Sequence, residues 1–145
     1  MGGGVSAPKR IQRQRAKGWR MPDGAIYVGR PSKWGNPYVA LPTADGFSVF
    51  RRVRLSSGEQ LDVWIERVGI VTRAQAIAES VRMYRKWIEA WAEDEYGDEP
   101  DPIRFVLDEL RGHDLACWCS LDDGDGMAQP CHADVLLELA NREQA

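Results

Sequence analysis

The longest regular pattern of apolar positions predicts an α-helix from about residue 73 to about residue 93. Its apolar residues follow one another in steps of four and three, the spacing of one helical stripe: Ile77, Val81, Tyr84, Ile88 and Trp91. Thr72 and Gln75 precede the stripe at the spacing of a capping box, in which each side chain accepts a hydrogen bond from the other residue's backbone N–H. We therefore expect a long amphipathic helix whose stripe faces the core.

Two further helices are expected in the C-terminal half of the chain. Asp101 followed by Pro102 is typical of a helix N-terminus, and Gly112 is typical of a helix end. The buried face of this helix would consist of Ile103, Val106, Leu107 and Leu110. Pro130 opens the last helix, whose inward positions would be Val135, Leu136 and Leu139.

Short apolar runs and alternating segments predict the strands. Residues 25–28 form a run that contains Tyr27 and two β-branched residues, and Gly29 ends it. Residues 47–55 and 61–65 are extended segments separated by a turn, so they predict a β-hairpin. Residues 115–119 are typical of a short buried strand.

The order of these elements indicates one small α/β domain with a mixed sheet, a β-hairpin and about three helices. A chain of 145 residues is long enough to bury a core without disulfides or metals. Residues 1–18 are rich in glycine and then in basic residues. We therefore expect a flexible basic arm over residues 1–18 and a single α/β domain over residues 19–145.

Charge is distributed unevenly along the chain, although the formal net charge is only −3. The first 22 residues contain no acidic side chain and these basic ones: Lys9, Arg10, Arg13, Arg15, Lys17 and Arg20. Acidic residues gather at 93–101 and 121–126. This pattern excludes a uniformly basic nucleic-acid binder. Two interpretations of the arm remain: it contacts the phosphates of a nucleic acid, or it is solvated or lies over the chain's own acidic surface.

The cellular compartment is predicted from three features of the sequence: its apolar runs, its N-terminus and its cysteine count. No apolar run approaches the roughly 20 residues of a membrane span. The N-terminus has no apolar stretch of the secretory kind. Three cysteines are an odd number, so a disulfide framework is not expected. We therefore expect a protein of the reducing cytoplasm without a membrane partner.

The cysteines and one histidine form the group with the most suggestive chemistry. Cys117 and Cys119 are two residues apart on an expected strand, so their thiols point to one face. Cys131 and His132 stand at the start of the last helix, where free backbone N–H groups and the helix dipole lower the pKa of a thiol. A strand, a loop and a helix in this order bring the two pairs close together.

Three interpretations of this group remain open. The thiols and the imidazole can be ordinary core and capping groups. They can instead bind tetrahedral zinc through Cys117, Cys119, Cys131 and His132. They can also form an active or ligand-binding site, in which Cys131 or Cys119 is the nucleophile or His132 is the acid or base. In that case Asp134 can orient the imidazole.

The loop over residues 29–37 (GRPSKWGNP) is a second candidate site. It contains cations, polar groups, an aromatic ring and a glycine that permits close approach to the backbone. Together these groups can bind a phosphate or a nucleotide through Gly29, Arg30, Ser32, Lys33, Trp34 and Asn36. It matches neither a Walker loop nor a dinucleotide fingerprint. Arg30 and Asn36 are the strongest candidates, because a generic turn requires neither. The alternative is a packed turn in which Trp34 fills the core.

Several stretches together resemble the domain of unknown function 4326 family, which is common in bacteriophages and their bacterial hosts. They are residues 10–13 (RIQR), 17–22 (KGWRMP), 27–37 (YVGRPSKWGNP), 110–119 (LRGHDLACWC) and 130–136 (PCHADVL). The resemblance covers the chain from about residue 10 to about residue 142. It implies a fold and a phage or bacterial source, but no established activity. Family members usually have a shorter loop between the two cysteine-containing motifs.

The preferred hypothesis is a cavity that the residue 29–37 loop and the cysteine–histidine group share. Its ligand would be anionic and nucleotide-like, held by Arg30 and Lys33. The protein would act on a nucleotide or base as a hydrolase or transferase, with Cys131 or His132 carrying the reactive step. The alternative is a module without catalysis, stapled by zinc, whose basic arm binds nucleic acid.

Overall fold

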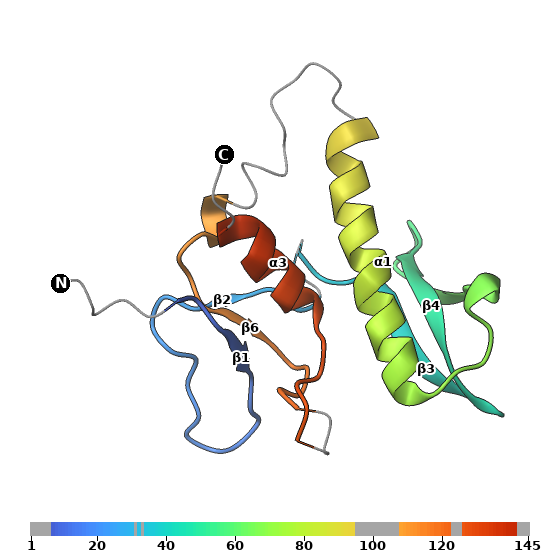
Figure 1. Ribbon diagram of the computed structural model, residues 1–145, viewed down its shortest axis with the longest axis horizontal. Helices are drawn as coiled ribbons and strands as arrows, with labels where there is room; N and C mark the ends of the chain where they lie inside the picture. The colour runs from blue at the N-terminus through green and yellow to red at the C-terminus, as the bar shows by residue number, and fades with distance from the viewer. Residues whose placement is uncertain (1–6, 31, 33, 95–107, 123–125, 142–145) are drawn as a thin grey trace.

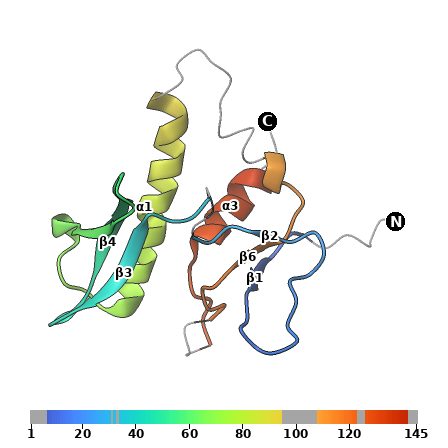
Figure 2. The same cartoon turned by 180° about the vertical axis from the view of Figure 1, so that it is seen from behind.

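The computed structural model describes residues 7–30, 32, 34–94, 108–122 and 126–141. Two sheets, each with a helix packed on it, lie side by side (Figure 1). One is a parallel sheet of three strands and the other an antiparallel sheet of three strands. The expected α/β class is confirmed, with the parallel and antiparallel strands divided between two sheets. Figure 2 shows the same arrangement from behind.

The parallel sheet has the order β1–β6–β2 and joins segments from both ends of the chain. Its strands are β1 (Arg10–Gln12), β2 (Ile26–Tyr27) and β6 (Leu115–Cys117). The central strand β6 is fully buried. Because all three strands run in one direction, the segments that follow them emerge at one edge of the sheet. That edge holds the two motifs singled out in the sequence.

Strand β1 corrects the expected boundary between the arm and the domain. Residues 10–12 fall within the expected flexible arm, but they pair with β6 in parallel register. Backbone hydrogen bonds extend this pairing, from Leu115 N to Lys9 O (3.0 Å) and from Arg13 N to Cys117 O (2.7 Å). The sequence hid this strand because Ile11 is its only apolar residue, and a strand this short gives no alternation.

The antiparallel sheet contains the expected hairpin, formed by β4 (Gly46–Arg54) and β5 (Gln60–Trp64). A third strand, β3 (Tyr38–Thr43), pairs with β4 and was not expected. Pro42 argues against a strand in sequence, but β3 is an edge strand, where a missing N–H is tolerated. A short 3₁₀ helix, η1 (Glu66–Val68), leads from β5 towards the long helix.

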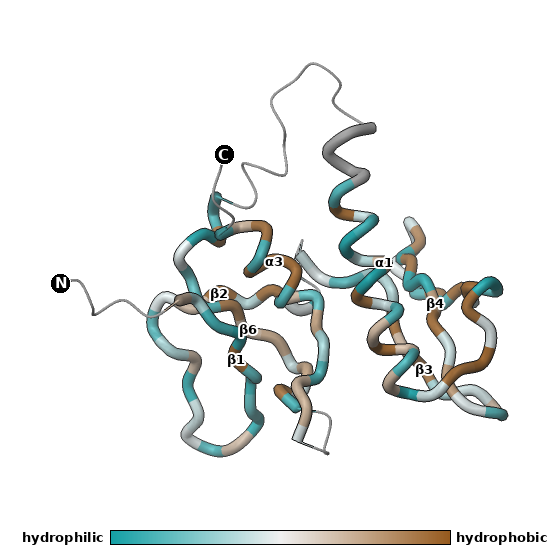
Figure 3. The backbone as a smooth tube through the Cα atoms, viewed as in Figure 1, coloured by the Kyte–Doolittle hydropathy of each residue, from teal (hydrophilic) through white to brown (hydrophobic). Residues whose placement is uncertain are grey.

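Helix α1 (Arg73–Asp94) confirms the longest predicted element and its cap. Thr72 N donates to Gln75 Oε1 at 2.9 Å, and Gln75 N donates to Thr72 Oγ1 at 3.1 Å. The helix contributes buried residues to two apolar clusters. Tyr84 packs with the parallel sheet and the last helix, whereas Ala76 and Met83 pack with the antiparallel sheet. Apolar and polar positions accordingly alternate along α1 (Figure 3).

The last helix, α3 (His132–Asn141), is also as expected, with Val135 and Leu136 buried and Leu139 partly buried. Residues 108–110 are helical and Leu110 is fully buried, while the expected start of that helix at Asp101 lies outside the described residues. So does most of the acidic segment 93–101. No helix in the described part of the chain is long and apolar enough to cross a membrane.

Candidate functional site

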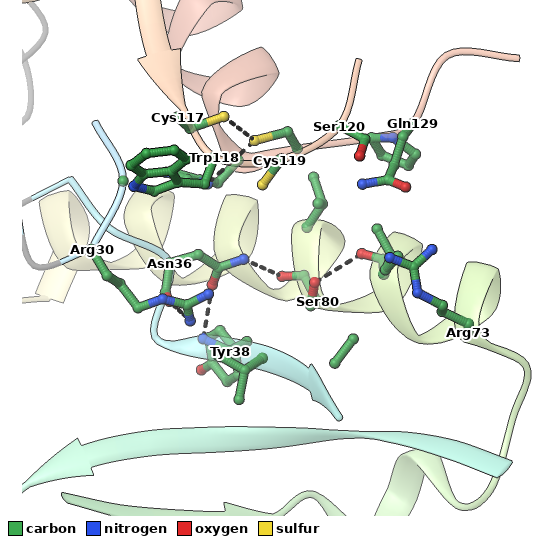
Figure 4. A pocket seen from close by; sticks show the side chains of 18 of the residues that line it. Arg30, Asn36, Tyr38, Arg73, Ser80, Cys117, Trp118, Cys119, Ser120 and Gln129 are labelled. Atoms are coloured by element: carbon green, nitrogen blue, oxygen red, sulfur yellow. Dashed lines mark hydrogen bonds between the residues drawn. The ribbon is translucent and has the colours of Figure 1, made fainter. Parts of the chain in front are cut away.

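A cavity of about 420 Å³ lies between the parallel sheet and α1. Its floor and one wall come from the loop after β2, from β3 and from α1, while the segments flanking β6 and α3 form the opposite wall (Figure 4). Segments nearly a hundred residues apart therefore face one another across it.

Seven of the residues expected at a site line this one cavity. They are Gly29, Arg30 and Asn36 from the loop, with Cys119, Cys131 and His132 from the thiol motif; Cys117 joins them. Ser32 and Trp34 do not line it. Trp34 packs against the core instead, and its carbonyl oxygen accepts a hydrogen bond from Tyr84 Oη at 2.8 Å. Lys33 lies outside the described residues.

The loop after β2 is shaped by close packing around Gly29. Tyr27 Oη donates to the backbone oxygen of Arg30 at 2.5 Å, which folds the tyrosine ring back over the loop. A Cβ atom on Gly29 would stand 2.5 Å from that hydroxyl, so any larger residue would displace the ring. Ser32 N donates to Gly29 O and completes a tight turn. The glycine is therefore needed for this loop conformation.

Asn36 fastens the end of the loop to the rest of the fold. Its side chain is buried, and Oδ1 accepts a hydrogen bond from Tyr38 N at 2.8 Å. Its Nδ2 donates to the backbone oxygen of Ser80 on α1 at 3.3 Å. Both ends of the amide are thus used within the protein. Asn36 shapes the cavity wall, and only part of its donor capacity is left for a ligand.

Arg30 brings a positive charge to the cavity wall without a neutralising partner in the described residues. Its Nη1 donates to the backbone oxygen of Asn36 at 3.1 Å. Burial, and after it the charge of Arg52, lower the pKa of Arg30. Arg52 itself is paired with Asp62 through two hydrogen bonds of 2.8 and 3.1 Å. The guanidinium remains charged at neutral pH and favours an anionic neighbour.

Cys131 directly precedes α3 and has the environment of a stabilised thiolate. The backbone N of Ala133, in the first turn of the helix, donates to Cys131 Sγ at 3.5 Å. Cys131 N in turn donates to Asp134 Oδ2 at 3.1 Å, so the carboxylate caps the same helix end. Unpaired N–H groups and the helix dipole at this position favour the anionic form of a thiol.

The other thiols add to this effect. Cys117 Sγ lies 3.3 Å from Cys131 Sγ, and both side chains are buried. Hydrogen bonds with Cys117 and Cys119 lower the pKa of Cys131, and they outweigh the opposing effect of burial. The same contacts raise the pKa of Cys117. The pair is therefore a buried thiol donating to a buried thiolate.

His132 faces this thiolate through a fixed ring nitrogen. Its Nε2 lies 2.7 Å from the backbone oxygen of Val28, which can only accept, so Nε2 carries a proton. Its Nδ1 lies 3.5 Å from Cys131 Sγ. Burial acts to lower the pKa of His132, but hydrogen bonds with Cys119 and Cys131 outweigh it and raise the pKa to about 9. At neutral pH the His132 imidazolium and the Cys131 thiolate therefore form an ion pair.

Arg10 belongs to the same electrostatic group, although the sequence placed it on a surface arm. Its side chain is only 7% exposed. Its Nη2 donates to the backbone oxygens of Gln129 (2.6 Å) and Leu121 (3.3 Å), and its Nε lies 3.5 Å from Asp134 Oδ1. Burial opposes its charge, but a hydrogen bond with Cys131, and after it the negative charges of Asp134 and Cys131, raise the pKa of Arg10 overall. Arg10 is therefore a buried counterion within the protein.

Sequence reasoning missed part of the cavity wall. Arg73 and Ser80 on α1 line it, as does Gln129 before the last helix. Arg73 stands in the first turn of α1 beside the predicted cap. Ser80 is a polar residue next to the apolar stripe, and its backbone oxygen holds Asn36. A polar residue beside the apolar stripe was the sequence signal that could have indicated this part of the cavity wall.

Three close cysteines are also a possible metal-binding group in the geometric sense. The Sγ atoms of Cys117, Cys119 and Cys131 all lie within 4.8 Å of one another. Soft thiolate ligands at this separation can hold a metal ion. His132 Nδ1 is adjacent, and its other nitrogen is bound to a backbone carbonyl, as is common for metal-ligating histidines.

The fold and the site define a small α/β protein with a thiol-lined cavity between a parallel and an antiparallel sheet. A family model described as a domain of unknown function (DUF4326) matches residues 11–142. The chain belongs to this family, as its motifs suggested. Searches for similar curated proteins and for similar solved structures found no match.

Proposed function

We propose that the cavity binds an anionic, nucleotide-like small molecule and that the thiolate of Cys131 reacts with it. One observation supports this most: the loop residues Gly29, Arg30 and Asn36 line the same cavity as Cys119, Cys131 and His132. The two motifs meet at the edge where α/β proteins bind their ligands. Three free thiols also suit a reducing compartment, so we place the protein in the cytoplasm.

The charge of the cavity wall favours an anion. Among the described residues that line it, two are arginines, Arg30 and Arg73, and none is a carboxylate. The ion pair of His132 and Cys131 adds no net charge. This is notable in a chain with 22 acidic and 19 basic residues. A phosphate group suits guanidinium donors because two N–H groups can bind two phosphate oxygens. The volume of about 420 Å³ is in the range of small-molecule sites.

The chemistry that fits this site is nucleophilic catalysis. The Cys131 thiolate would attack an electrophilic carbon or phosphorus of the ligand, forming a bond to sulfur as the bond to the leaving group breaks. The His132 imidazolium would supply the proton that the leaving group takes up. Water or a second acceptor would then release the covalent adduct, giving a hydrolase or a transferase. Cys119 would support the thiolate by hydrogen bonding.

Binding is tested by isothermal titration calorimetry with a panel of 5′-nucleoside mono- and diphosphates and with inorganic phosphate. Arg30→Met keeps much of the packing of the side chain but removes its charge, and we expect about 10- to 100-fold weaker binding. The matched control is Arg82→Met, because Arg82 is paired with Glu79 on α1 and does not line the cavity. Saturable binding that Arg30→Met leaves unchanged, or no binding across the panel, would contradict the proposal.

A second candidate function is favoured by the thiol geometry. Cys117, Cys119 and Cys131 would bind zinc, with His132 Nδ1 as the fourth ligand, and the ion would staple β6 to α3. The thiols would then be structural rather than reactive. In this case the protein is a binding module and the cavity holds its ligand without covalent chemistry.

Metal analysis distinguishes the two candidates. The structural-zinc account predicts one equivalent of zinc in protein purified without chelators, lower content in Cys119→Ser, and unfolding when the ion is removed. The catalytic account predicts three titratable free thiols and a fold that tolerates chelation. Zinc at one equivalent together with unreactive thiols would exclude Cys131 as the nucleophile.

A further inference from the structure

The mouth of the cavity carries two arginines that its proposed small ligand does not require. Arg13 follows β1, and its guanidinium carbon lies 4.7 Å from the centroid of Tyr27 and 4.8 Å from that of Trp118. The guanidinium carbon of Arg15 lies 4.7 Å from the centroid of Trp118. Tyr27 and Trp118 both line the cavity, so this group, which we call the arginine ladder (Arg13, Arg15, Tyr27 and Trp118), continues its wall outwards.

The ladder is positively charged, and no residue that the structure describes neutralises it. No carboxylate oxygen in the described part of the chain lies within 4.0 Å of the guanidinium of Arg13 or Arg15. The Nε atom of Arg13 is buried and has no hydrogen-bond partner there. A buried donor without a partner is costly and is rare in folded proteins. Cation–π stacking on Trp118 orders both side chains in advance, so an arriving anion has less side-chain entropy to remove.

The ladder also explains why Trp118 is 41% exposed. Its ring serves as a support for two guanidinium groups rather than as part of the core. Tyr27 connects this support to the cavity, because its hydroxyl holds the backbone of Arg30. The guanidinium groups of Arg13 and Arg15 thus both lie on rings that line the same cavity as Arg30.

We propose that the ligand is a nucleotide unit of a single-stranded nucleic acid, with the nucleotide in the cavity and the adjoining phosphates on Arg13 and Arg15. This inference rests on the proposed function and specifies its substrate class. Two guanidinium groups on the aromatic rings of the cavity, in addition to Arg30 in its wall, fit a polyanion better than a single nucleotide. A single strand can insert one nucleotide without first unstacking a duplex. The acidic residues elsewhere in the chain disfavour broad contact with a duplex.

The test compares 5′-nucleoside monophosphates with single-stranded DNA and RNA octamers of mixed sequence, measured by calorimetry and fluorescence anisotropy. We expect the octamers to bind at least about tenfold more tightly than the monophosphates, with an affinity that falls as salt rises. Arg15→Gln should weaken octamer binding about 5- to 10-fold and reduce the salt slope by about 1, while monophosphate binding changes less than about twofold. Trp118→Leu keeps both arginines but removes their support, and it should also weaken octamer binding.

The matched control is Arg20→Gln, which removes the same charge from an exposed residue of the same segment that does not belong to the ladder. It should change octamer affinity by less than about twofold. Equal effects of Arg15→Gln and Arg20→Gln on octamer affinity would overturn the inference, because the loss would then reflect overall charge and not the ladder. Octamers that bind no more tightly than monophosphates would also overturn it and leave the proposed function standing. Failure of both ligand classes to bind would overturn the two together.

Discussion

The Nε2 atom of His132 lies 2.7 Å from the carbonyl oxygen of Val28. This contact joins the start of α3 to the end of β2, immediately before the loop that carries Arg30. It also assigns the ring's proton, because a carbonyl oxygen can only accept. The remaining nitrogen is thereby directed at Cys131, and the histidine couples the two motifs of the site.

His132→Gln tests this coupling through the pH dependence of stability. Glutamine can still donate to Val28 but cannot pair with the thiolate. The pKa of His132 is raised to about 9 in the folded protein, above its ordinary value of 6.5. The stabilisation is therefore fully present below pH 6.5 and is lost as pH rises through 9. Urea unfolding should show wild type more stable than the variant by about 1–3 kcal/mol at pH 6, with the difference shrinking towards pH 9.5. A difference that is constant with pH would contradict the ion pair.

The Cys131 thiolate can be observed directly by its ultraviolet absorbance near 240 nm. Because its pKa is lowered, we expect one thiolate in the difference spectrum between wild type and Cys131→Ser already at pH 6. An ordinary thiol would appear only near a pH of about 8.5. Cys117→Ala removes one hydrogen-bond donor to this sulfur and should shift the transition to higher pH. A first thiolate that appears only above pH 8 in wild type would refute the assignment.

Arg10 is expected to matter for stability more than any other basic residue near the N-terminus. Arg10→Met keeps the bulk of the side chain but removes the guanidinium that donates to the backbone oxygen of Gln129 and pairs with Asp134. We expect a loss of about 3 kcal/mol in the free energy of unfolding, measured in urea. Arg20→Met, on an exposed residue, should cost less than about 0.5 kcal/mol. Equal stabilities of the two variants would show that the buried contacts of Arg10 contribute nothing.

Much of the fold follows from sequence where a periodic pattern is long. Helix α1 and its capping box are visible because five apolar positions and two capping residues agree with one another. The β4–β5 hairpin is visible because two extended segments flank a polar turn. Strands β1 and β3 are invisible for opposite reasons. Ile11 is alone among polar residues, and Pro42 stands in a segment that only its edge position allows to be a strand.

The candidate site divides in a similar way. Residue type alone indicates four of the candidate residues, because turns and helix starts do not need them: Arg30, Asn36, Cys131 and His132. The sequence could not show that Arg10 is a buried counterion, because its role depends on a three-residue strand pairing with β6, more than a hundred residues away. Nor could the sequence decide whether Trp34 contacts a ligand or packs against the core, as it does. Such outcomes are decided by tertiary packing rather than local pattern.

Asn36 is expected to act through structure more than through direct ligand contact. Asn36→Ala leaves the Tyr38 N–H and the Ser80 carbonyl without their buried partner. It should cost about 2 kcal/mol in the free energy of unfolding, and it should weaken ligand binding by loosening the loop. Ser80→Ala removes a hydroxyl that donates to the backbone oxygen of Ile77 in its own helix, and it should cost less than about 1 kcal/mol. Thermal unfolding of the two variants, followed by calorimetric titration, separates these effects.

The central claim is that the cavity beside Arg30 is an anion site, and NMR tests it most directly. The arginine Nε–Hε resonances are followed while 5′-nucleoside monophosphates are titrated into the protein. The account predicts saturable shifts of the Arg30 resonance and of the backbone amides of Gly29 and His132, while Arg82 stays unchanged. Shifts confined to residues away from the cavity would contradict this claim. So would the absence of any shift at the highest ligand concentration that can be reached.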